Sequence, residues 1–401
     1  MIQANMRSFY WLRVNRSLAA FSISFFLVLT TWLILSSTGS IFYTGLIASI
    51  TAAISVLLSP IAGHVVDKMN RRKLLIVISL LELAAYSVFL LLLIIQLPFY
   101  LYYAVIAVVY FLEIQAGMLS FAMTPQLVDE KKLVFANSLT EISLTVSEFL
   151  GPVMAGVMVS VISGYSASIF VLVIVLVIAS IFAFMVPRGG DLLSESLNNE
   201  EAQPELKGWK AALHFARSNF AAVILFSTTL SSFLVVLDVL GAPLIRIVDH
   251  GSLIYYGLFV GFYSLGGFLG AFLPPVLKVK RIGKLVLLYF LTSGVALILM
   301  ALVPQVLLDL LLIFLIGFIA SITNVPLMAF LQKSIPSEII GKVTSIMDIS
   351  RMSLAPVAAF VMAASGSEYG VISLFLVSGI SILFLCLIIP LTKVMKIEVS
   401  A

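Results

Sequence analysis

Residues 52–86 read AAISVLLSPIAGHVVDKMNRRKLLIVISLLELAAY, in which two apolar runs flank a short basic loop. The runs extend over 42–66 and 73–96, and a helix needs about 20 apolar residues to cross the hydrocarbon core of a bilayer. The loop carries Lys68, Arg71, Arg72 and Lys73, and such cations concentrate on the cytoplasmic side of membrane proteins. This stretch therefore predicts two membrane-spanning helices joined in the cytoplasm.

The composition of the whole chain extends this interpretation. Of the 401 residues, 62% are apolar and 10% are charged, whereas soluble domains carry about 25% charged residues. So few charges cannot cover a water-soluble body of this size, which excludes a cytosolic enzyme, a nucleic-acid binder and a disordered chain. The chain is a polytopic membrane protein surrounded by lipid, and no nucleic-acid partner is expected despite its net charge of +4.

Twelve apolar runs are long enough to span a bilayer. Continuous runs of Leu, Ile, Val and Phe exclude a spanning β-barrel, which needs short alternating segments. We therefore predict an all-α membrane protein with twelve transmembrane helices. The expected spans are 17–37, 42–66, 73–96, 99–123, 133–162, 166–187, 219–243, 253–277, 284–303, 305–330, 340–364 and 370–391.

Basic residues orient these spans. All Lys and Arg residues except Arg246 and Arg351 fall in segments on one side, with Arg7, Arg13 and Arg16 preceding the first span. This distribution predicts that both termini are cytoplasmic in a multi-pass protein of the plasma membrane, with the first span retained as a signal anchor. Its single cysteine, Cys386, lies inside an apolar run, so no disulfide or cysteine metal site is expected.

The chain divides into two halves. Residues 188–218 form the one long polar stretch, which predicts a cytoplasmic linker between six-helix halves at 1–187 and 219–401. Ser138–Ser143 (SLTEIS) is similar to Ser345–Ser350 (SIMDIS), and the two stretches occupy equivalent positions in the two halves. Two related halves are typical of secondary transporters.

The loop after the second run resembles the signature of the major facilitator superfamily, G-x-x-x-D-x-x-x-R-R/K. Gly63, Asp67, Arg71 and Arg72 stand at its defining positions. The resemblance implies the major facilitator fold, with two pseudo-symmetric halves, and a gating role for this loop. Gly63 is expected to allow a close backbone approach. The plainer alternative is a basic loop that only sets topology.

Further stretches resemble the macrolide-efflux-like branch of that superfamily. The first comprises Thr124–Val128 with Ala136–Leu139, and the second runs from Asn324 to Val343. This resemblance implies proton-driven export of amphipathic compounds. Gly151, Pro152 and Gly156 are similar to the antiporter motif of drug exporters, although these residues could simply kink and pack a helix. Gly257, Gly261, Gly266 and Gly270 offer close-packing surfaces on the eighth span.

Carboxylates inside a membrane are functional candidates because they are costly to bury. The list is Glu82, Glu113, Glu141, Glu148, Asp238, Asp309 and Asp348. Glu148 is the first proton-coupling candidate, followed by Glu141, which shares its helix face, and Glu113. Each could instead be structural, and Glu113 could steady Arg71 or Arg72. Asp238 and Asp309 are expected to be solvated near outer ends.

Asp348 and Arg351 lie three residues apart and can form an intramembrane ion pair. One possibility is that this ion pair stays fixed. The other is that Arg351 alternates between Asp348 and a carboxylate of the first half, such as Glu148. We expect no catalytic residue, metal or cofactor, and ATP-driven transport is excluded because no phosphate loop is present.

The sequence thus predicts a monomeric secondary transporter that exports amphipathic small molecules, drug-like or macrolide-like, against protons by alternating access. An exporter or importer of a native metabolite or siderophore remains the alternative. A non-transporting membrane sensor is a further alternative, which the absence of an extramembrane domain disfavours.

Overall fold

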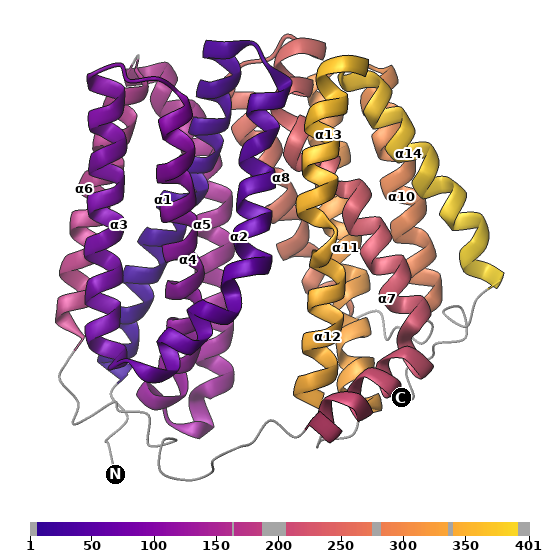
Figure 1. The fold of residues 1–401 in the computed structure, drawn as a ribbon, viewed down its shortest axis with the longest axis horizontal. Helices are drawn as coiled ribbons and strands as arrows, with labels where there is room; N and C mark the ends of the chain where they lie inside the picture. Colours follow the sequence, from indigo (N-terminus) through magenta and orange to yellow (C-terminus); the bar gives the residue numbers. More distant parts are fainter. Residues whose placement is uncertain (1–5, 163, 187–205, 275–281, 336–339, 392–401) are drawn as a thin grey trace. The chain divides into compact units, whose positions relative to one another are not determined.

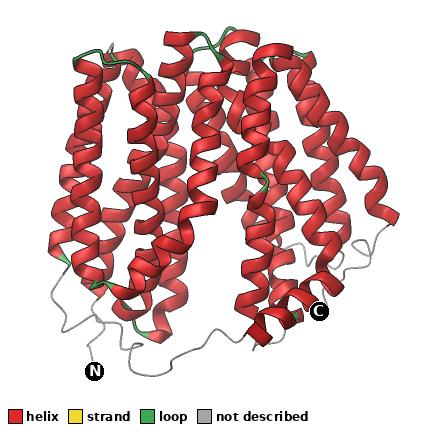
Figure 2. Cartoon of the chain, viewed as in Figure 1, coloured by secondary structure: helices red, strands yellow, loops and turns green. Residues whose placement is uncertain are grey.

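The computed structural model describes residues 6–162, 164–186, 206–274, 282–335 and 340–391, and its described secondary structure is helical throughout (Figure 2). Eleven of the described helices are long and apolar enough to cross a membrane. Helices dominate because a helix satisfies its own backbone hydrogen bonds where no water is available. The expected all-α fold class is confirmed.

The chain forms two compact units, which are described separately. The first unit contains Met1–Ser37, Ala53–Glu200 and Tyr256–Gly261, and the second contains Thr38–Ala52, Glu201–Tyr255 and Phe262–Ala401. Helix α2 therefore contributes its first part to the second unit, and helix α8 contributes a short segment to the first. The expected linker 188–218 lies partly outside the described residues, and its remainder begins helix α7 at Leu206.

In the first unit, α3 packs against both α4 and α6 (Figure 1). Asn70 caps the start of α3 by accepting a hydrogen bond from the backbone N–H of Lys73 at 3.0 Å. The first unit contains α1 (Met6–Thr38), the part of α2 (Ile41–Lys68) from Ala53 onward, α3 (Arg71–Ile94), α4 (Tyr100–Leu127), the 3₁₀ turn η1 (Glu130–Lys132), α5 (Leu133–Ile162) and α6 (Tyr165–Met185).

The second unit repeats this pattern, because α10 packs against both α11 and α14 (Figure 1). Gly294 of α10 and Gly379 of α14 allow close contact: a Cβ added at Gly379 would lie 2.9 Å from the Gly294 carbonyl oxygen. The helices are α7 (Leu206–Pro243), α8 (Leu253–Ala271), α10 (Ile282–Leu302), α11 (Val306–Ser334), α12 (Ile340–Ser353), α13 (Ala355–Tyr369) and α14 (Val371–Ile388), with short segments η3 (Leu244–Val248) and η4 (Ile389–Leu391).

Two expected boundaries are wrong. The first span was expected to begin at residue 17, but α1 begins at Met6, because Phe9 and Leu12 continue its apolar face and are both fully buried. The span expected at 340–364 is instead two helices separated at Leu354. Pro356 lies in the first turn of α13, where its missing N–H is tolerated, and it cannot continue the hydrogen bonding of α12. By contrast, α5 is a single helix through Pro152.

Candidate functional site

The first unit contains a buried ion pair between α1 and α4. Arg16 Nη2 donates to Glu113 Oε1 at 2.6 Å, and Arg16 Nη1 donates to Glu113 Oε2 at 3.3 Å. The side chains are 3% and 22% exposed, respectively. Two charge-assisted hydrogen bonds from one planar guanidinium fix both the distance and the orientation of the carboxylate.

A second carboxyl group lies beside this ion pair. Glu82 of α3 is 5% exposed and interacts electrostatically with both Arg16 and Glu113. Tyr86, one turn further along α3, is 2% exposed. We refer to Arg16, Glu82 and Glu113 as the acid cluster. It contains one cation and two carboxyl groups, contributed by three different helices.

Further polar residues of α1 are buried around the acid cluster. Arg13 is 4% exposed and donates from Nη2 to Ser120 Oγ at 3.2 Å. Asn15 donates to Ser79 Oγ at 3.0 Å and to the Ala179 carbonyl at 2.9 Å. Arg13 and Arg16 were expected to precede the first span, but both lie within α1 and are buried. These contacts bring α1 together with α3, α4 and α6.

The two favoured carboxylates of α5 lie differently. Glu148 and Glu141 are both exposed. Glu148 interacts electrostatically with Glu141 and with Glu113, and Glu141 interacts with Arg13. Among the residues that the structure describes, the one ion pair within 4.0 Å is Arg16–Glu113. The structure thus places Glu113, the third candidate, in the acid cluster, while Glu148 and Glu141 lie along an exposed face.

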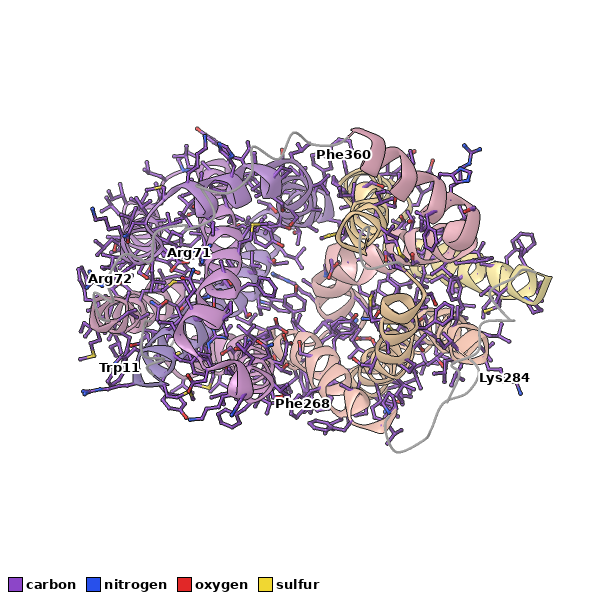
Figure 3. All side chains as sticks on the ribbon, turned by 90° about the horizontal axis from the view of Figure 1, so that it is seen from below. Trp11, Arg71, Arg72, Phe268, Lys284 and Phe360 are labelled. Atoms are coloured by element: carbon purple, nitrogen blue, oxygen red, sulfur yellow. The ribbon has the colours of Figure 1, made fainter. Side chains whose placement is uncertain are left out.

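The signature loop connects α2 to α3. Arg71 Nη1 donates to the Ala122 carbonyl of α4 at 3.0 Å, and Arg72 Nε donates to the Val186 carbonyl after α6 at 2.6 Å. Figure 3 shows Arg72 nearer than Arg71 to the edge of the first unit. Both guanidinium groups thus bind helix carbonyls. The suggestion that Glu113 steadies one of them is wrong, because Glu113 binds Arg16.

The other two positions of that signature are Gly63 and Asp67, and the structure describes the surroundings of Gly63 alone. A Cβ added at Gly63 would meet only Met118 Sδ at 4.0 Å, so the close backbone approach expected there is absent. Asp67 lies in the last turn of α2, and its side chain lies outside the described part of the structure. The side chains of Asp348 and Arg351 on α12 also lie outside it.

Small residues bring α5 close to two other helices. A Cβ added at Gly151 would lie 2.7 Å from the Phe21 carbonyl oxygen of α1. One added at Gly257 of α8 would collide with the Pro152 carbonyl, and one at Gly261 would lie 3.1 Å from the Phe149 carbonyl oxygen. Gly156 of α5 is also buried. Larger residues at Gly151 or Gly257 would force the helices apart.

The other glycine pair of α8 faces a different helix. A Cβ added at Gly266 would collide with the Phe314 carbonyl, and one at Gly270 would collide with the Phe318 carbonyl, both on α11. The pairs four residues apart on α8 thus pack against α5 in the first unit and against α11 in the second.

The second unit contains a cavity of about 280 Å³ between α7, α8, α10 and α11, with Met347 of α12 also lining it. Its walls combine aromatic, methionine and small polar side chains, and none of its lining residues is charged. Such a surface suits an uncharged ligand that is apolar on one side and hydrogen-bonding on another. The lining includes Phe226, Ser227, Ser231, Tyr263, Tyr289, Phe290, Ser321, Thr323, Asn324, Met328 and Met347.

Asp238 and Asp309, the carboxylates expected to be solvated near outer ends, differ in their exposure. Asp238 of α7 is exposed. Asp309, in the first turn of α11, is 0% exposed, so the expectation was wrong for this residue. Its burial results from contacts with a connection distant in sequence.

Arg13 and Arg16 are not among the site residues that the sequence predicts, and Glu82 is only one of its seven candidate membrane carboxylates. One signal was available: Phe9 and Leu12 are three residues apart, a helical spacing that extends the first span across both arginines. The pairing of Arg16 with Glu113, 97 residues away, has no local signal.

Comparison with known proteins supports the fold. Residues 14–359 match the family model of the Major Facilitator Superfamily. The structure is similar to a point mutant of the nucleoside transporter NupG, with a TM-score of 0.77 and 13% identity, covering 96% of this chain and 99% of that one. It is also similar to a mutant of the peptide transporter POT, with a TM-score of 0.75 and 11% identity over 98% and 96% of the two chains.

A third similar structure is a bacterial homolog of the human lysosomal transporter Spinster, with a TM-score of 0.69 and 14% identity over 96% and 97% of the two chains. At these identities the likeness shows the fold alone. No curated protein matches the sequence significantly.

Proposed function

This chain belongs to the Major Facilitator Superfamily, and from that premise we propose that it exports uncharged amphipathic small molecules in exchange for protons. That it is a secondary transporter and not an enzyme follows from the family. Proton exchange and an uncharged substrate are both supported by one observation: the ionisable acid cluster is in the first unit, whereas the cavity in the second unit has no charged lining residue. The resemblance to macrolide-efflux-like exporters supports the direction of transport.

The acid cluster supplies the proton site. Arg16 compensates one partly buried carboxylate, Glu113, and leaves the buried Glu82 without a cation of its own. An uncompensated charge is expensive inside a membrane protein, so Glu82 carries the proton in one state and releases it when its surroundings change. Glu148, which is exposed on α5 and interacts electrostatically with Glu113 and Glu141, relays protons between Glu82 and water together with Glu141.

The cavity supplies the substrate site. Met328 and Met347 adapt their shape to different ligands, whereas Thr323 and Asn324 offer hydrogen bonds. A charged metabolite or a siderophore would find no opposite charge on these walls, which favours neutral drug-like or macrolide-like compounds over the alternative substrates.

The signature loop controls exchange between conformations. Arg71 and Arg72 bind the carbonyl groups of Ala122 and Val186, and thereby tie the start of α3 to α4 and α6. We assign Asp67 to the same control, and we assign Gly151, Pro152 and Gly156 to close packing of α5. We assign Asp348 and Arg351 of α12 to an ion pair in which Arg351 changes its carboxylate partner during transport.

Filling the cavity should weaken substrate binding. Ser227→Phe places an aromatic ring in the cavity, and we expect the KM for an amphipathic substrate to rise at least about tenfold, equivalent to about 1.4 kcal/mol. Transport into everted membrane vesicles, measured against substrate concentration, gives this value. Nucleosides and short peptides are tested beside the amphipathic compounds.

The matched control is Ser227→Ala, which removes the hydroxyl group but adds no bulk. Because Ser227 Oγ donates to the Ile224 carbonyl of its own helix at 3.0 Å, its loss should leave KM within about twofold. An unchanged KM in a monodisperse Ser227→Phe protein would remove the cavity from the substrate pathway.

Both termini are proposed to be cytoplasmic, and single cysteines can report this. In a Cys386→Ser background, Ser37→Cys and Gly164→Cys should react with an impermeant maleimide added outside intact cells. Ser194→Cys should react only after the membrane is opened. Ser37 is preferred to Gly39, whose φ of +64° disfavours any side chain. Labelling of Ser194→Cys in intact cells would reverse the topology.

A further inference from the structure

The connection between α7 and α8 folds back on the helix that precedes it. After Pro243 the chain continues as a π-helical segment, η3, and the backbone N–H of Asp249 donates to the Leu244 carbonyl at 3.1 Å. The N–H of Gly251 donates to the Ile245 carbonyl at 2.6 Å. Between them, His250 has a φ of +55°, which is uncommon for a residue with a side chain. Local strain of this kind marks a functional segment in many proteins.

This connection, Asp249–Ser252, is held tightly against the start of α11. A Cβ added at Gly251 would lie 3.3 Å from Val306 Cγ2 and 2.9 Å from Ile245 Cγ2. Only glycine fits there without movement of its neighbours. The connection therefore docks between η3 and the first turn of α11, which contains Asp309.

Two carboxyl groups meet at this docking point. Asp309 is 0% exposed, and the side chains of Asp249 and Asp309 lie within hydrogen-bonding reach of each other. All four of their carboxylate oxygens are buried, and none finds a hydrogen-bond donor in the described part of the chain. Two ionised carboxylates offer only acceptors to each other, so a bond between them requires a proton.

We propose that Asp249 and Asp309 together bind one proton, which holds the connection between α7 and α8 against α11. In the bound form one carboxyl group donates its proton to the other carboxylate. Release of that proton to water leaves two facing negative charges, and their repulsion favours undocking of the connection. This site belongs to the second unit, whereas the acid cluster belongs to the first, and it does not depend on the proposed export function.

Other ionisable groups near the pair modify this equilibrium. His250, when protonated, favours an ionised Asp249 and therefore opposes proton binding. Arg246 lies one turn earlier on η3. The last turn of α10 and the first turn of α14 contain no ionisable residue, whereas the ends of α8 and α13 that flank the connection carry Tyr255, Tyr256, Glu368 and Tyr369.

The direction of the pH effect follows from burial. Burial raises the pKa of Asp249 above its ordinary value. For a carboxyl group with a raised pKa, the stabilisation of the docked form is complete below the ordinary value of about 3.9, and it is lost as the pH rises through the raised pKa. The connection is therefore docked at low pH and released at higher pH.

Hydrogen–deuterium exchange of the full chain in lipid nanodiscs tests this inference. After correction for intrinsic exchange, protection of amides in 245–255 should fall by up to about tenfold per pH unit once the pH exceeds the pKa of the pair. In Asp309→Asn the amide group donates the hydrogen bond at every pH, so protection should no longer depend on pH. Asp249→Asn should behave in the same way, and it provides a second variant if Asp309→Asn does not fold.

The control is Asp238→Asn, on the exposed surface of α7, which should keep the wild-type pH profile. A wild-type profile that is flat with pH would overturn the proposal. So would protection that depends on added Ca²⁺ or Mg²⁺ and not on pH, because the pair would then bind a metal ion.

Discussion

Arg16→Ala should lower the stability of the protein by about 3–5 kcal/mol, because it leaves the Glu113 carboxylate partly buried without its cation. Thermal or denaturant unfolding of the purified protein measures this loss. The arginine makes two hydrogen bonds to one carboxylate, so a neutral replacement removes both together.

Arg7→Ala is the matched control on the same helix. Arg7 is exposed and lies over the Trp11 ring at 5.6 Å, an interaction that contributes about 0.5–1 kcal/mol at an exposed site. The double variant Arg16→Met with Glu113→Leu should recover much of the loss, since replacing both partners leaves no uncompensated charge. Equal losses for Arg16→Ala and Arg7→Ala would show that the buried ion pair is not a structural centre.

Glu82→Gln should abolish proton-driven accumulation of substrate while leaving downhill exchange intact. A gradient of two pH units is worth about 2.7 kcal/mol, which sustains about hundredfold accumulation for exchange of one proton per neutral substrate. With glutamine at this position the acid cluster keeps the Arg16–Glu113 pair but loses its exchangeable proton. The accumulation ratio in proteoliposomes with an imposed pH gradient should therefore fall to about one.

Glu148→Gln distinguishes the exposed carboxylate of α5 from the buried one. If Glu148 only relays protons, this variant slows accumulation but reaches the same final ratio. Normal accumulation by Glu82→Gln, together with its loss in Glu148→Gln, would transfer the coupling role to α5.

Much of the fold could be predicted from the sequence, because the membrane imposes one strong rule. Apolar runs of sufficient length become helices, and the runs expected at 73–96 and 133–162 are close to the observed α3 and α5. The break at Leu354 was missed because the apolar pattern continues across it, although Pro356 marks the place. The signature loop predicted the family whose model matches residues 14–359.

The candidate site was harder to predict, because burial of a charge depends on partners distant in the sequence. From the sequence alone, Arg16 is expected among the cytoplasmic residues before the first span. The packing of α1, α3 and α4 places it beside Glu113 and Glu82, which are distant in the sequence. Asp309 resembles a solvated outer residue until the connection at Asp249 folds over it. Glu148, the first proton-coupling candidate from the sequence, is exposed on α5.

If substrate and protons move in opposite directions through this protein, a substrate gradient alone should drive protons across the membrane. Wild-type protein is reconstituted into liposomes that contain a pH-sensitive dye, with no pH gradient imposed, and a neutral amphipathic substrate is added outside. We expect substrate entry to be accompanied by proton exit, so that the interior becomes alkaline, and Glu82→Gln should abolish this signal while substrate still enters. Substrate entry without any pH change in the wild type, or acidification of the interior, would contradict proton exchange.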